Sequence, residues 1–588
     1  MDSKHVTEST SGQEDIQKTW WKEAIIYQIY PRSFQDSDDD GIGDLNGITS
    51  RLDYIQSLGV DIIWLNPIFL SPNDDNGYDI SDYREIMREF GTMEDFDRLL
   101  KEIHKREMRL VLDLVVNHTS DEHPWFEEAR KSRHNPYYNY YHWWPAEKGE
   151  PPLRLSYFDE EGNAWTYNKP TDSYYLHYFS RKQPDLNWEN PEVRQEIFDM
   201  MRFWFDKGID GFRMDSISLI AKDPSFPLID SKKYPDIFSF YAKEPRLHLY
   251  LHEMNRQVLS KYDCMSVGEG SAVMVDDVAK FVDPAREELN MLYHFDAARI
   301  RNTTLPDNPE SGIDYSLIAL KKMFTEWDKA VDKGWPSIYL GNHDQPRMVS
   351  RFGSDKDEFR ALSAKMLITF LLTMRGTPYW FAGDEIGMRN IRFDRIEDYN
   401  DIDTINRYKK AKAEGKDPQA VLDEQKETGR DNARTPFQWD RSPEAGFTAG
   451  TPWLKVNPDY TWINVADEEK DPTSILNYFK KVVSFRKENP SLIYGSYHLL
   501  DAENPQSYTF LRKTGADTYL IMLNFSPKAA ISTPGIDMSN AHVLLDNYGD
   551  RSHMAPQKDI TLRPFEAIVF QLNHPVYESF IDSLDLLE

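Results

Sequence analysis

Short apolar stretches rich in β-branched and aromatic residues recur along the chain, and amphipathic helical stretches separate them. This alternation predicts parallel strands connected by helices. Eight such strands indicate an α/β fold with a closed (β/α)8 barrel, whose functional site is expected at the carboxyl ends of the strands. The predicted strands are residues 24–30, 61–66, 109–116, 211–215, 265–269, 289–295, 337–340 and 377–381.

Two interruptions and a change of pattern divide the chain. The segment after the third strand is rich in Tyr, Trp and Pro and is too long for a simple connection, which predicts an inserted small domain. After a predicted helix near 474–487, short alternating strands such as 508–511 and 518–523 predict a C-terminal antiparallel β-sandwich. The expected parts are a disordered tail (1–17), the barrel (18–116 and 188–490, with an excursion at 383–440), the inserted domain (117–187), the β domain (491–575) and a second tail (576–588).

Composition narrows the classes of function. Hydrophobic residues make up 40% of the 588 residues and charged residues 28%, as in globular proteins. The formal net charge of −29 argues against binding to nucleic acid or to an anionic membrane surface. The single cysteine, Cys264, excludes an internal disulfide and a multi-cysteine metal site.

The sequence contains no apolar stretch long enough to span a membrane, and its amino-terminal residues lack the apolar core of a signal peptide. We therefore expect a cytoplasmic protein, with a periplasmic or secreted protein whose signal has been removed as the alternative. A monomer or a small homo-oligomer fits these features equally well.

Acidic and histidine residues stand at the ends of four of the predicted strands, although strands buried on both faces favour apolar residues. They are Asp113 with Asn117 and His118, Arg213 with Asp215, Glu269, and His343 with Asp344. Any one of them could be a structural residue that caps a loop. Several charged groups at one barrel mouth are costly to bury without a function.

Cleavage of a glycosidic bond requires one carboxylate that attacks or stabilises the anomeric carbon and one carboxyl group that protonates the leaving oxygen. Arg213 lies two residues before Asp215 and shares a strand face with it. Its guanidinium would keep that aspartate ionised, as a nucleophile requires, while neighbouring negative charge or burial would keep the general acid protonated.

The motifs DLVVNH, GFRMD, VGE and NHD, in this order and at strand ends, are similar to those of glycoside hydrolase family 13, the α-amylase family. QPDLN at 183–187, NHDQPR at 342–347 and ARTPFQW at 433–439 resemble the oligo-1,6-glucosidase and α-glucosidase subfamily. The resemblance extends over roughly residues 20–572. It implies a retaining, exo-acting α-glucosidase for short α-glucosides such as maltose, isomaltose or sucrose, with transglucosylation as a side activity and no organic cofactor.

The same resemblance assigns roles to individual residues. Asp215 would be the nucleophile, Glu269 the general acid/base, and Asp344 the group that binds the 2- and 3-hydroxyls of the sugar. Ser216, which follows the nucleophile, stands at a position that tracks linkage preference in the family and favours α-1,4 cleavage or broad tolerance. The expected glucose pocket comprises Tyr78, Asp79, His118, Arg213, His343 and Arg434, with Tyr167 and Phe179 as an aromatic rim or as packing within the inserted domain.

An acidic loop follows the first predicted strand. Its oxygen-bearing residues alternate, and Gly41 permits the tight turn that a hard-cation site needs. A solvated acidic turn is the alternative, but the loop resembles the structural calcium or magnesium site of the subfamily. The implied ligands are Asp36, Asp38, Asp40, Asp44 and the carbonyl oxygen of Ile42.

The sequence leaves two alternative functions. A sucrose isomerase or related glucosyltransferase would use the same fold and nucleophile. Sucrose isomerases carry an RLDRD-like stretch, which is missing between Glu269 and Asp344 here. The similar stretch RFDRI lies at 392–396, after the eighth predicted strand, so hydrolysis is favoured. A non-catalytic binding subunit with this fold would need a membrane span and would tolerate loss of the acids, whereas this sequence shows no span and keeps every acid. The sequence also departs from the family pattern at Gly270, Ser271 and Ala382. Relatives often have a bulkier residue in place of Gly270, a proline in place of Ser271 and a glutamine in place of Ala382.

Overall fold

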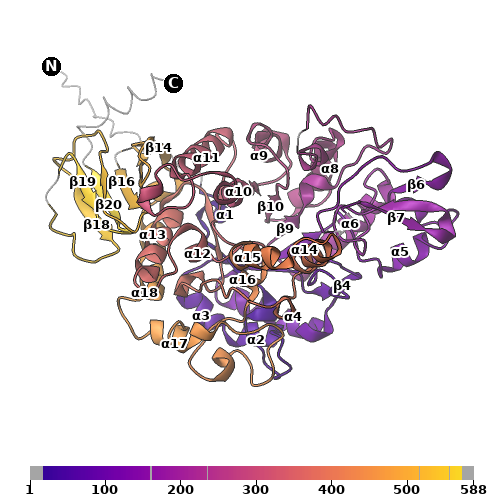
Figure 1. Ribbon diagram of the computed structural model, residues 1–588, viewed down its shortest axis with the longest axis horizontal. Helices are drawn as coiled ribbons and strands as arrows, with labels where there is room; N and C mark the ends of the chain where they lie inside the picture. The colour runs from indigo at the N-terminus through magenta and orange to yellow at the C-terminus, as the bar shows by residue number, and fades with distance from the viewer. Residues whose placement is uncertain (1–17, 159–161, 235, 516, 555–556, 573–588) are drawn as a thin grey trace, which may run out of the picture.

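The computed structural model describes residues 18–158, 162–234, 236–515, 517–554 and 557–572. The predicted tails 1–17 and 576–588 lie outside these ranges. The barrel occupies the middle of the molecule, the C-terminal β domain lies at one end, and the inserted domain lies at the other (Figure 1). In the described part of the chain, no helix is both long and apolar enough to cross a membrane.

Eight parallel strands form the central sheet, as the sequence predicts. They follow the order β11-β10-β9-β5-β2-β1-β13-β12. The two end strands are joined by side chains: the Ser337 hydroxyl donates to the Leu292 carbonyl at 2.9 Å, and the Tyr339 hydroxyl donates to that of His294 at 2.6 Å. The strands are β1 (Ile26–Ile29), β2 (Ile62–Leu65), β5 (Arg109–Val115), β9 (Gly211–Asp215), β10 (Met265–Glu269), β11 (Met291–Tyr293), β12 (Ser337–Ile338) and β13 (Thr377–Phe381).

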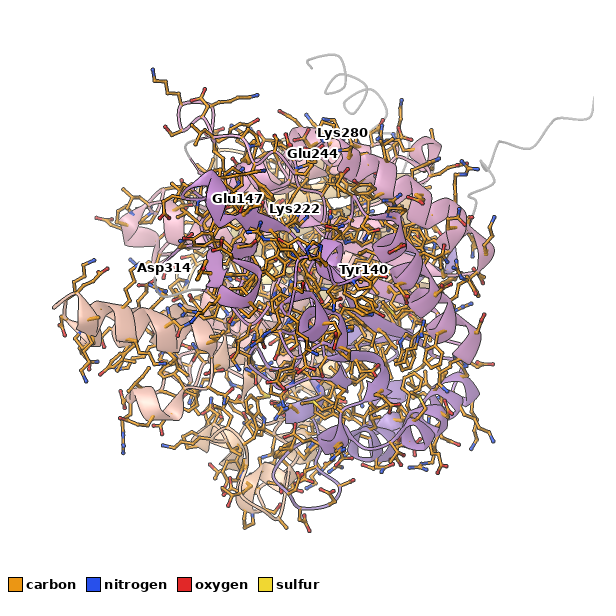
Figure 2. All side chains as sticks on the ribbon, turned by 90° about the vertical axis from the view of Figure 1, so that its right-hand side faces the viewer. Tyr140, Glu147, Lys222, Glu244, Lys280 and Asp314 are labelled. Atoms are coloured by element: carbon orange, nitrogen blue, oxygen red, sulfur yellow. The ribbon has the colours of Figure 1, made fainter. Side chains whose placement is uncertain are left out.

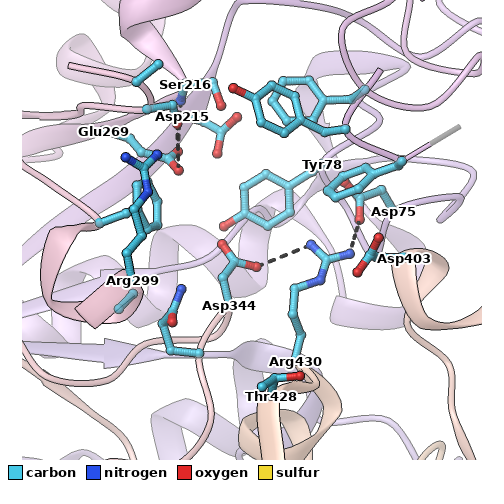
Figure 3. Close-up of a pocket in the computed structure, with 18 of the residues that line it drawn as sticks. Asp75, Tyr78, Asp215, Ser216, Glu269, Arg299, Asp344, Asp403, Thr428 and Arg430 are labelled. Atoms are coloured by element: carbon cyan, nitrogen blue, oxygen red, sulfur yellow. Dashed lines mark hydrogen bonds and ion pairs between the residues drawn. The ribbon is translucent and has the colours of Figure 1, made fainter. Parts of the chain in front are cut away.

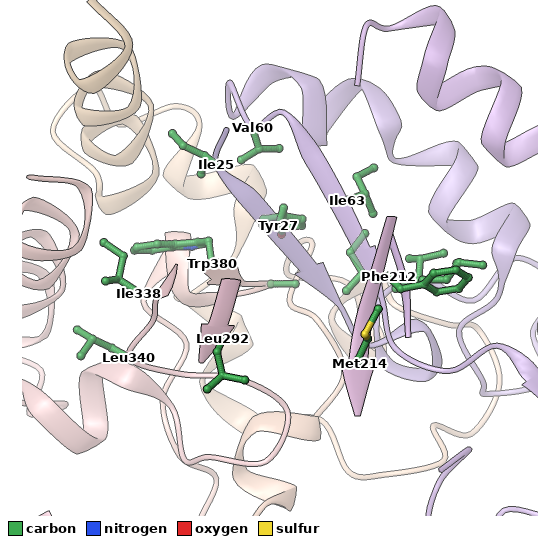
Figure 4. Close-up of a cluster of buried hydrophobic side chains, with 14 of the residues drawn as sticks. Ile25, Tyr27, Val60, Ile63, Phe212, Met214, Leu292, Ile338, Leu340 and Trp380 are labelled. Atoms are coloured by element: carbon green, nitrogen blue, oxygen red, sulfur yellow. The ribbon is translucent and has the colours of Figure 1, made fainter. Parts of the chain in front are cut away.

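Side chains alternate between the inside of the barrel and the surrounding helices. Ile26, Ile62 and Val111 belong to an inner cluster, whereas Tyr27 and Ile63 belong to the outer core. Figure 4 shows outer side chains from several strands packed together. Because both faces are buried, these strands are apolar nearly throughout, and their polar residues collect at the carboxyl ends.

Helices cover the outer face. Helix α4 begins with a capping box between Thr92 and Asp95 and buries Phe96, Leu99 and Ile103 on one side. Helix α13 is buried on nearly all sides, because it lies between helix α18 and the C-terminal strands. The covering helices include α4 (Met93–Lys105), α6 (Pro191–Lys207), α8 (Arg246–Gln257), α11 (Leu317–Ala330), α13 (Arg360–Thr373) and α18 (Ile475–Glu488).

The segment predicted as an inserted domain carries a three-stranded antiparallel sheet of order β6-β8-β7, with β6 (Trp143–Pro145), β7 (Trp165–Asn168) and β8 (Ser173–Leu176). Lys222, from the loop after β9, anchors this domain to the barrel. Its ammonium group donates to Asn117 at 2.6 Å and pairs with Asp185 at 3.0 Å. Figure 2 looks from the inserted-domain end and shows where Lys222 and Tyr140 lie there.

The excursion after β13 forms two packed helices, α14 (Ile402–Ala413) and α15 (Pro418–Thr428), followed by the short helix α16 (Asp431–Arg434). The C-terminal domain is a β-sandwich, as predicted. Its larger antiparallel sheet has the order β14-β15-β16-β20-β18, and β17 pairs with β19 in a second sheet. These strands are β14 (Ser496–Leu500), β15 (Ser507–Thr514), β16 (Asp517–Asn524), β17 (Ala530–Ser532), β18 (His542–Asp546), β19 (Ile560–Leu562) and β20 (Ala567–Leu572).

Candidate active site

The polar ends of the barrel strands meet around the guanidinium of Arg213, on β9. One terminal nitrogen, Nη1, donates to Asp215 at 2.6 Å and to Asp113 at 2.7 Å. The other, Nη2, donates to Glu269 at 2.8 Å. Asp215 and Glu269 are therefore held side by side on one planar group, and both line the same cavity (Figure 3).

The surroundings of Glu269 make it a weaker acid than an ordinary glutamic acid. Burial raises the pKa of Glu269 well above its ordinary value, and the negative charges of Asp215 and Asp344 act in the same direction, against Arg213. A carboxyl group with a raised pKa keeps its proton near neutral pH, as a general acid must. Burial also raises the pKa of Asp113, the third acid bonded to Arg213, to about 7, although Arg213 opposes this shift.

Asp344 has a different environment. Arg434 donates to it at 2.9 Å and Arg430 at 3.3 Å. Burial opposes its ionisation, but the adjacent His343 and these two arginines hold the pKa of Asp344 below its ordinary value. Asp344 is thus a permanent anion and can only accept hydrogen bonds, which suits a ligand with hydroxyl groups.

Tyr78 and His343 support Asp344 from one side. Their rings are stacked 5.3 Å apart, and the amide of Gln28 donates to His343 Nδ1 at 2.8 Å. The proton of the neutral imidazole therefore belongs on Nε2. That atom lies 2.7 Å from the Tyr78 hydroxyl and 3.2 Å from the Asp344 carboxylate.

The cavity has a volume of about 550 Å³, enough for a ligand of disaccharide size. Of the residues predicted from the sequence, it is lined by Tyr78, His118, Phe179, Asp215, Ser216, Glu269 and Asp344. Arg213, His343 and Arg434 are fully buried behind this lining and contact its acids instead.

Two predicted pocket residues lie elsewhere. Asp79 is completely buried, and its carboxylate accepts hydrogen bonds from the backbone amides of Asp74 and Asp75 at 2.8 and 3.0 Å. It shapes the loop that presents Asp75 to the cavity. Tyr167 is 48% exposed on strand β7, and its hydroxyl donates to Asp172 at 2.8 Å. Tyr167 is not among the residues that line the cavity, because its strand turns this side chain toward solvent.

The aromatic wall is built from other residues. Tyr157 and Phe158 line the cavity beside Phe179, and the rings of Tyr157 and Phe179 stack at 5.1 Å. Phe295, just after β11, lines it as well. The family resemblance implied an aromatic rim of Tyr167 and Phe179, but nothing in the sequence showed which aromatic side chains of 117–187 turn inward.

A charged group that was not predicted from the sequence lies at one end of the cavity. Arg430 pairs with Asp75 at 3.3 Å and with Asp344 at 3.3 Å, as Figure 3 shows. Asp403, on α14, lines the cavity nearby, and burial raises its pKa to about 6. Asp75 stands three residues before Tyr78, and Arg430 four residues before Arg434, so proximity to motif residues was the available signal.

The acidic loop after β1 brings three carboxylates together. One oxygen each from Asp36, Asp38 and Asp40 lies within 4.8 Å of the others. Asp44 is placed differently: it caps helix α2 (Leu45–Ser50) by accepting from the Gly47 amide at 2.7 Å, and it accepts from the backbone of Ser37 at the same distance. Three close carboxylates are the donor set that Ca²⁺ or Mg²⁺ prefers.

The fold and the acids gathered around Arg213 at the barrel mouth define a glycoside hydrolase with a (β/α)8 barrel. The sequence model described as "Alpha amylase, catalytic domain" matches residues 28–495. The chain belongs to the α-amylase family.

Named relatives of full length are also similar. An oligo-1,6-glucosidase of Parageobacillus thermoglucosidasius is 51% identical over 571 residues, which cover 95% of this chain and 100% of that protein. One of Bacillus cereus is 49% identical over 567 residues, 95% of this chain and 100% of that protein. Among solved structures, the isomaltulose synthase SmuA of Protaminobacter rubrum has a TM-score of 0.90 and 42% identity, with 95% of this chain and 100% of that chain covered.

Proposed function

We propose that this enzyme is a retaining, exo-acting α-glucosidase that hydrolyses terminal α-glucosidic bonds of disaccharides and short oligosaccharides. The observation that carries the proposal is the shared guanidinium of Arg213, which is bonded to both Asp215 and Glu269 at the edge of one cavity. Burial raises the pKa of Glu269, which keeps this carboxyl group protonated beside Asp215.

In the first step, Asp215 attacks the anomeric carbon and forms a covalent β-glucosyl ester. The bond to the leaving oxygen breaks, its electron pair stays on that oxygen, and Glu269 supplies the proton. In the second step, Glu269 takes a proton from water, which attacks the anomeric carbon and releases Asp215. A sugar hydroxyl in place of water gives transglucosylation.

The proposed exo mode is supported by the narrow end of the cavity. The side-chain amide of Asn406, on α14, donates to the Phe158 carbonyl of the inserted domain at 2.8 Å. The Arg430 guanidinium lies 4.7 Å from the Phe158 ring and also pairs with Asp75. These contacts narrow this end of the cavity, which supports a site for one terminal glucose beyond Asp215, with the leaving group on the side of Phe295 and Arg299.

The substrate class rests partly on the relatives, whose names specify oligo-1,6-glucosidases. Ser216 lines the cavity next to the nucleophile, and its small side chain leaves room for more than one linkage. We therefore include maltose, isomaltose and sucrose. A glucosyl-transferring isomerase is the second candidate, because the isomaltulose synthase has the same fold at a TM-score of 0.90.

We also propose a structural Ca²⁺ or Mg²⁺ on the acidic loop. Asp36, Asp38 and Asp40 would be its carboxylate ligands, with the carbonyl of Ile42 and the carboxylate of Asp44 completing the set. The closeness of the three carboxylates supports this, and burial, with the charges of Asp38 and Asp36, raises the pKa of Asp40. The ion would stabilise the fold and take no part in the reaction.

The test is a substrate panel of maltose, isomaltose, sucrose, trehalulose and soluble starch with chromatographic identification of products. We expect free glucose from the small α-glucosides and little product from starch. Accumulation of isomaltulose or trehalulose from sucrose would favour the isomerase instead. Asp215→Asn should retain at most about 10⁻⁴ of the wild-type rate, and substantial turnover would remove Asp215 from its role.

A further inference from the structure

The two oxygens of the Glu269 carboxyl group have different partners. Oε2 accepts from Arg213 Nη2 at 2.8 Å and from the Ser216 amide at 2.9 Å. Oε1 accepts from the Ser271 hydroxyl at 3.3 Å. An oxygen that already faces two donors is a poor place for a proton, so the proton that Glu269 exchanges belongs on Oε1.

Ser271 is held firmly beside that oxygen. Its own carbonyl accepts from the Ser218 hydroxyl at 2.6 Å, and the preceding Gly270 donates its amide to the Tyr293 carbonyl at 2.8 Å. A Cβ atom at Gly270 would lie 2.8 Å from Leu292 and 2.9 Å from Tyr293, so the turn leaves no room for a larger residue there. Ser271 also lines the cavity, on the side where the leaving group would lie.

Other groups around Glu269 shift its pKa, but Ser271 is the residue whose hydrogen bond reaches Oε1. Arg213 opposes protonation, while burial and the neighbouring acids favour it. Among the described residues, the titratable and charged groups that act on Glu269 include Arg213 and Asp215 on β9, Tyr293 on β11, Tyr339 and Asp344 after β12, and Tyr157 of the inserted domain.

We propose that Ser271 is a positioning residue for the general acid/base, whose hydroxyl aims Oε1 of Glu269 at the glycosidic oxygen and stabilises the carboxylate left after proton transfer. This rests on the proposed α-glucosidase mechanism. When Oε1 gives its proton to the leaving oxygen, the Ser271 hydroxyl donates to the new carboxylate. When Oε1 later takes a proton from water, that hydrogen bond is released.

The test compares two leaving groups in Ser271→Ala. A sugar leaving group needs protonation, whereas p-nitrophenolate leaves with little help. For maltose we expect kcat/KM to fall about tenfold, and for p-nitrophenyl α-glucoside less than about threefold. Loss of a donor to the carboxylate raises the pKa of Glu269, so the alkaline limb of the pH profile should move up by about half a unit.

Ser271→Thr keeps the hydroxyl and should recover maltose activity to within about threefold of wild type. Ser57→Ala is the matched control: Ser57 is exposed on the surface, away from the cavity lining, and its hydroxyl donates to the Tyr54 carbonyl at 2.7 Å. Its pH limb and substrate ratio should equal those of wild type. If Ser271→Ala folds poorly, Ser271→Cys provides the same comparison with a weak donor.

Equal losses on both substrates and an unmoved alkaline limb would overturn the role of Ser271 and leave the glucosidase mechanism intact. Failure of the mechanism itself has a different signature. In that case the wild-type enzyme would not release glucose from any α-glucoside, or Glu269→Gln would hydrolyse maltose as fast as wild type.

Discussion

Buried arginines occupy two regions of this molecule in opposite ways. At the barrel mouth, Arg213 is bonded to the carboxylates of Asp113 and Asp215 and to Glu269. Where the barrel meets the C-terminal domain, Arg486 and Arg512 are equally buried, but their hydrogen bonds go to backbone carbonyl oxygens. Both share the Leu492 carbonyl, at 3.0 and 2.7 Å.

The difference shows what buried charge can do. Carbonyl oxygens do not titrate, so Arg486 and Arg512 join two domains and exchange no protons. Their pKa values are lowered by burial, to about 9 for Arg486. Around Arg213, three acids share one positive charge, and burial still raises the pKa of Glu269, so this acid keeps its proton.

Replacing the central arginine should have the largest effect. Arg213→Gln removes the group that aligns Asp215 with Glu269 and leaves buried acids unpaired, at a cost of about 3–5 kcal/mol. We expect kcat/KM to fall roughly 10²- to 10⁴-fold. Arg213→Lys should restore little, because an ammonium group cannot bridge both carboxyls. Steady-state kinetics on maltose measure this, and near-normal activity in Arg213→Gln would contradict it.

The same kind of change at the domain junction should affect stability alone. Arg486→Met leaves the carbonyl oxygens of Leu372, Met374 and Gly376 without their donor. We expect the free energy of unfolding to fall by about 2–4 kcal/mol, measured by denaturant titration, with kcat unchanged at temperatures where the variant is folded. Arg441→Met is the control, because its side chain is 67% exposed. A lowered kcat in Arg486→Met would break the comparison.

The pH profile should separate the two regions next. Because the pKa of Glu269 is raised, its acid form persists as pH increases from 4.5, and kcat/KM should decline only when pH rises through that raised pKa. Beyond this limb the rate should drop about tenfold per pH unit. Arg486→Met should leave the limb in place. A wild-type rate that already declines from pH 5 upward would remove Glu269 as the acid.

The acidic loop provides the smallest test, since it has carboxylates without an arginine among them. If a divalent cation balances Asp36, Asp38 and Asp40, a chelator should lower the melting temperature by about 1–2 °C at modest occupancy, and added Ca²⁺ or Mg²⁺ should restore it. The double variant Asp38→Asn, Asp40→Asn should no longer respond to the ion. No shift in the wild-type protein would favour a solvated turn.

The sequence alone determined the barrel and the acids at its mouth, because period and motif are local. A strand buried on both faces has to be apolar, so Asp215 and Glu269 were visible as exceptions at the ends of their strands. The strand bounds were predicted less well: the prediction of 289–295 exceeds the observed Met291–Tyr293, since only these three residues pair with β10.

The tertiary structure decided which polar residues face the cavity, because that depends on loops that meet only after folding. Asp75 and Asp79 stand in one acidic stretch, yet the first lines the pocket and the second is fully buried. Arg430 comes from the excursion after β13 and narrows the pocket together with Asp75 and Phe158. Periodicity predicts which face of a strand or helix is buried. A loop has no repeating pattern, so the sequence does not predict the direction of its side chains.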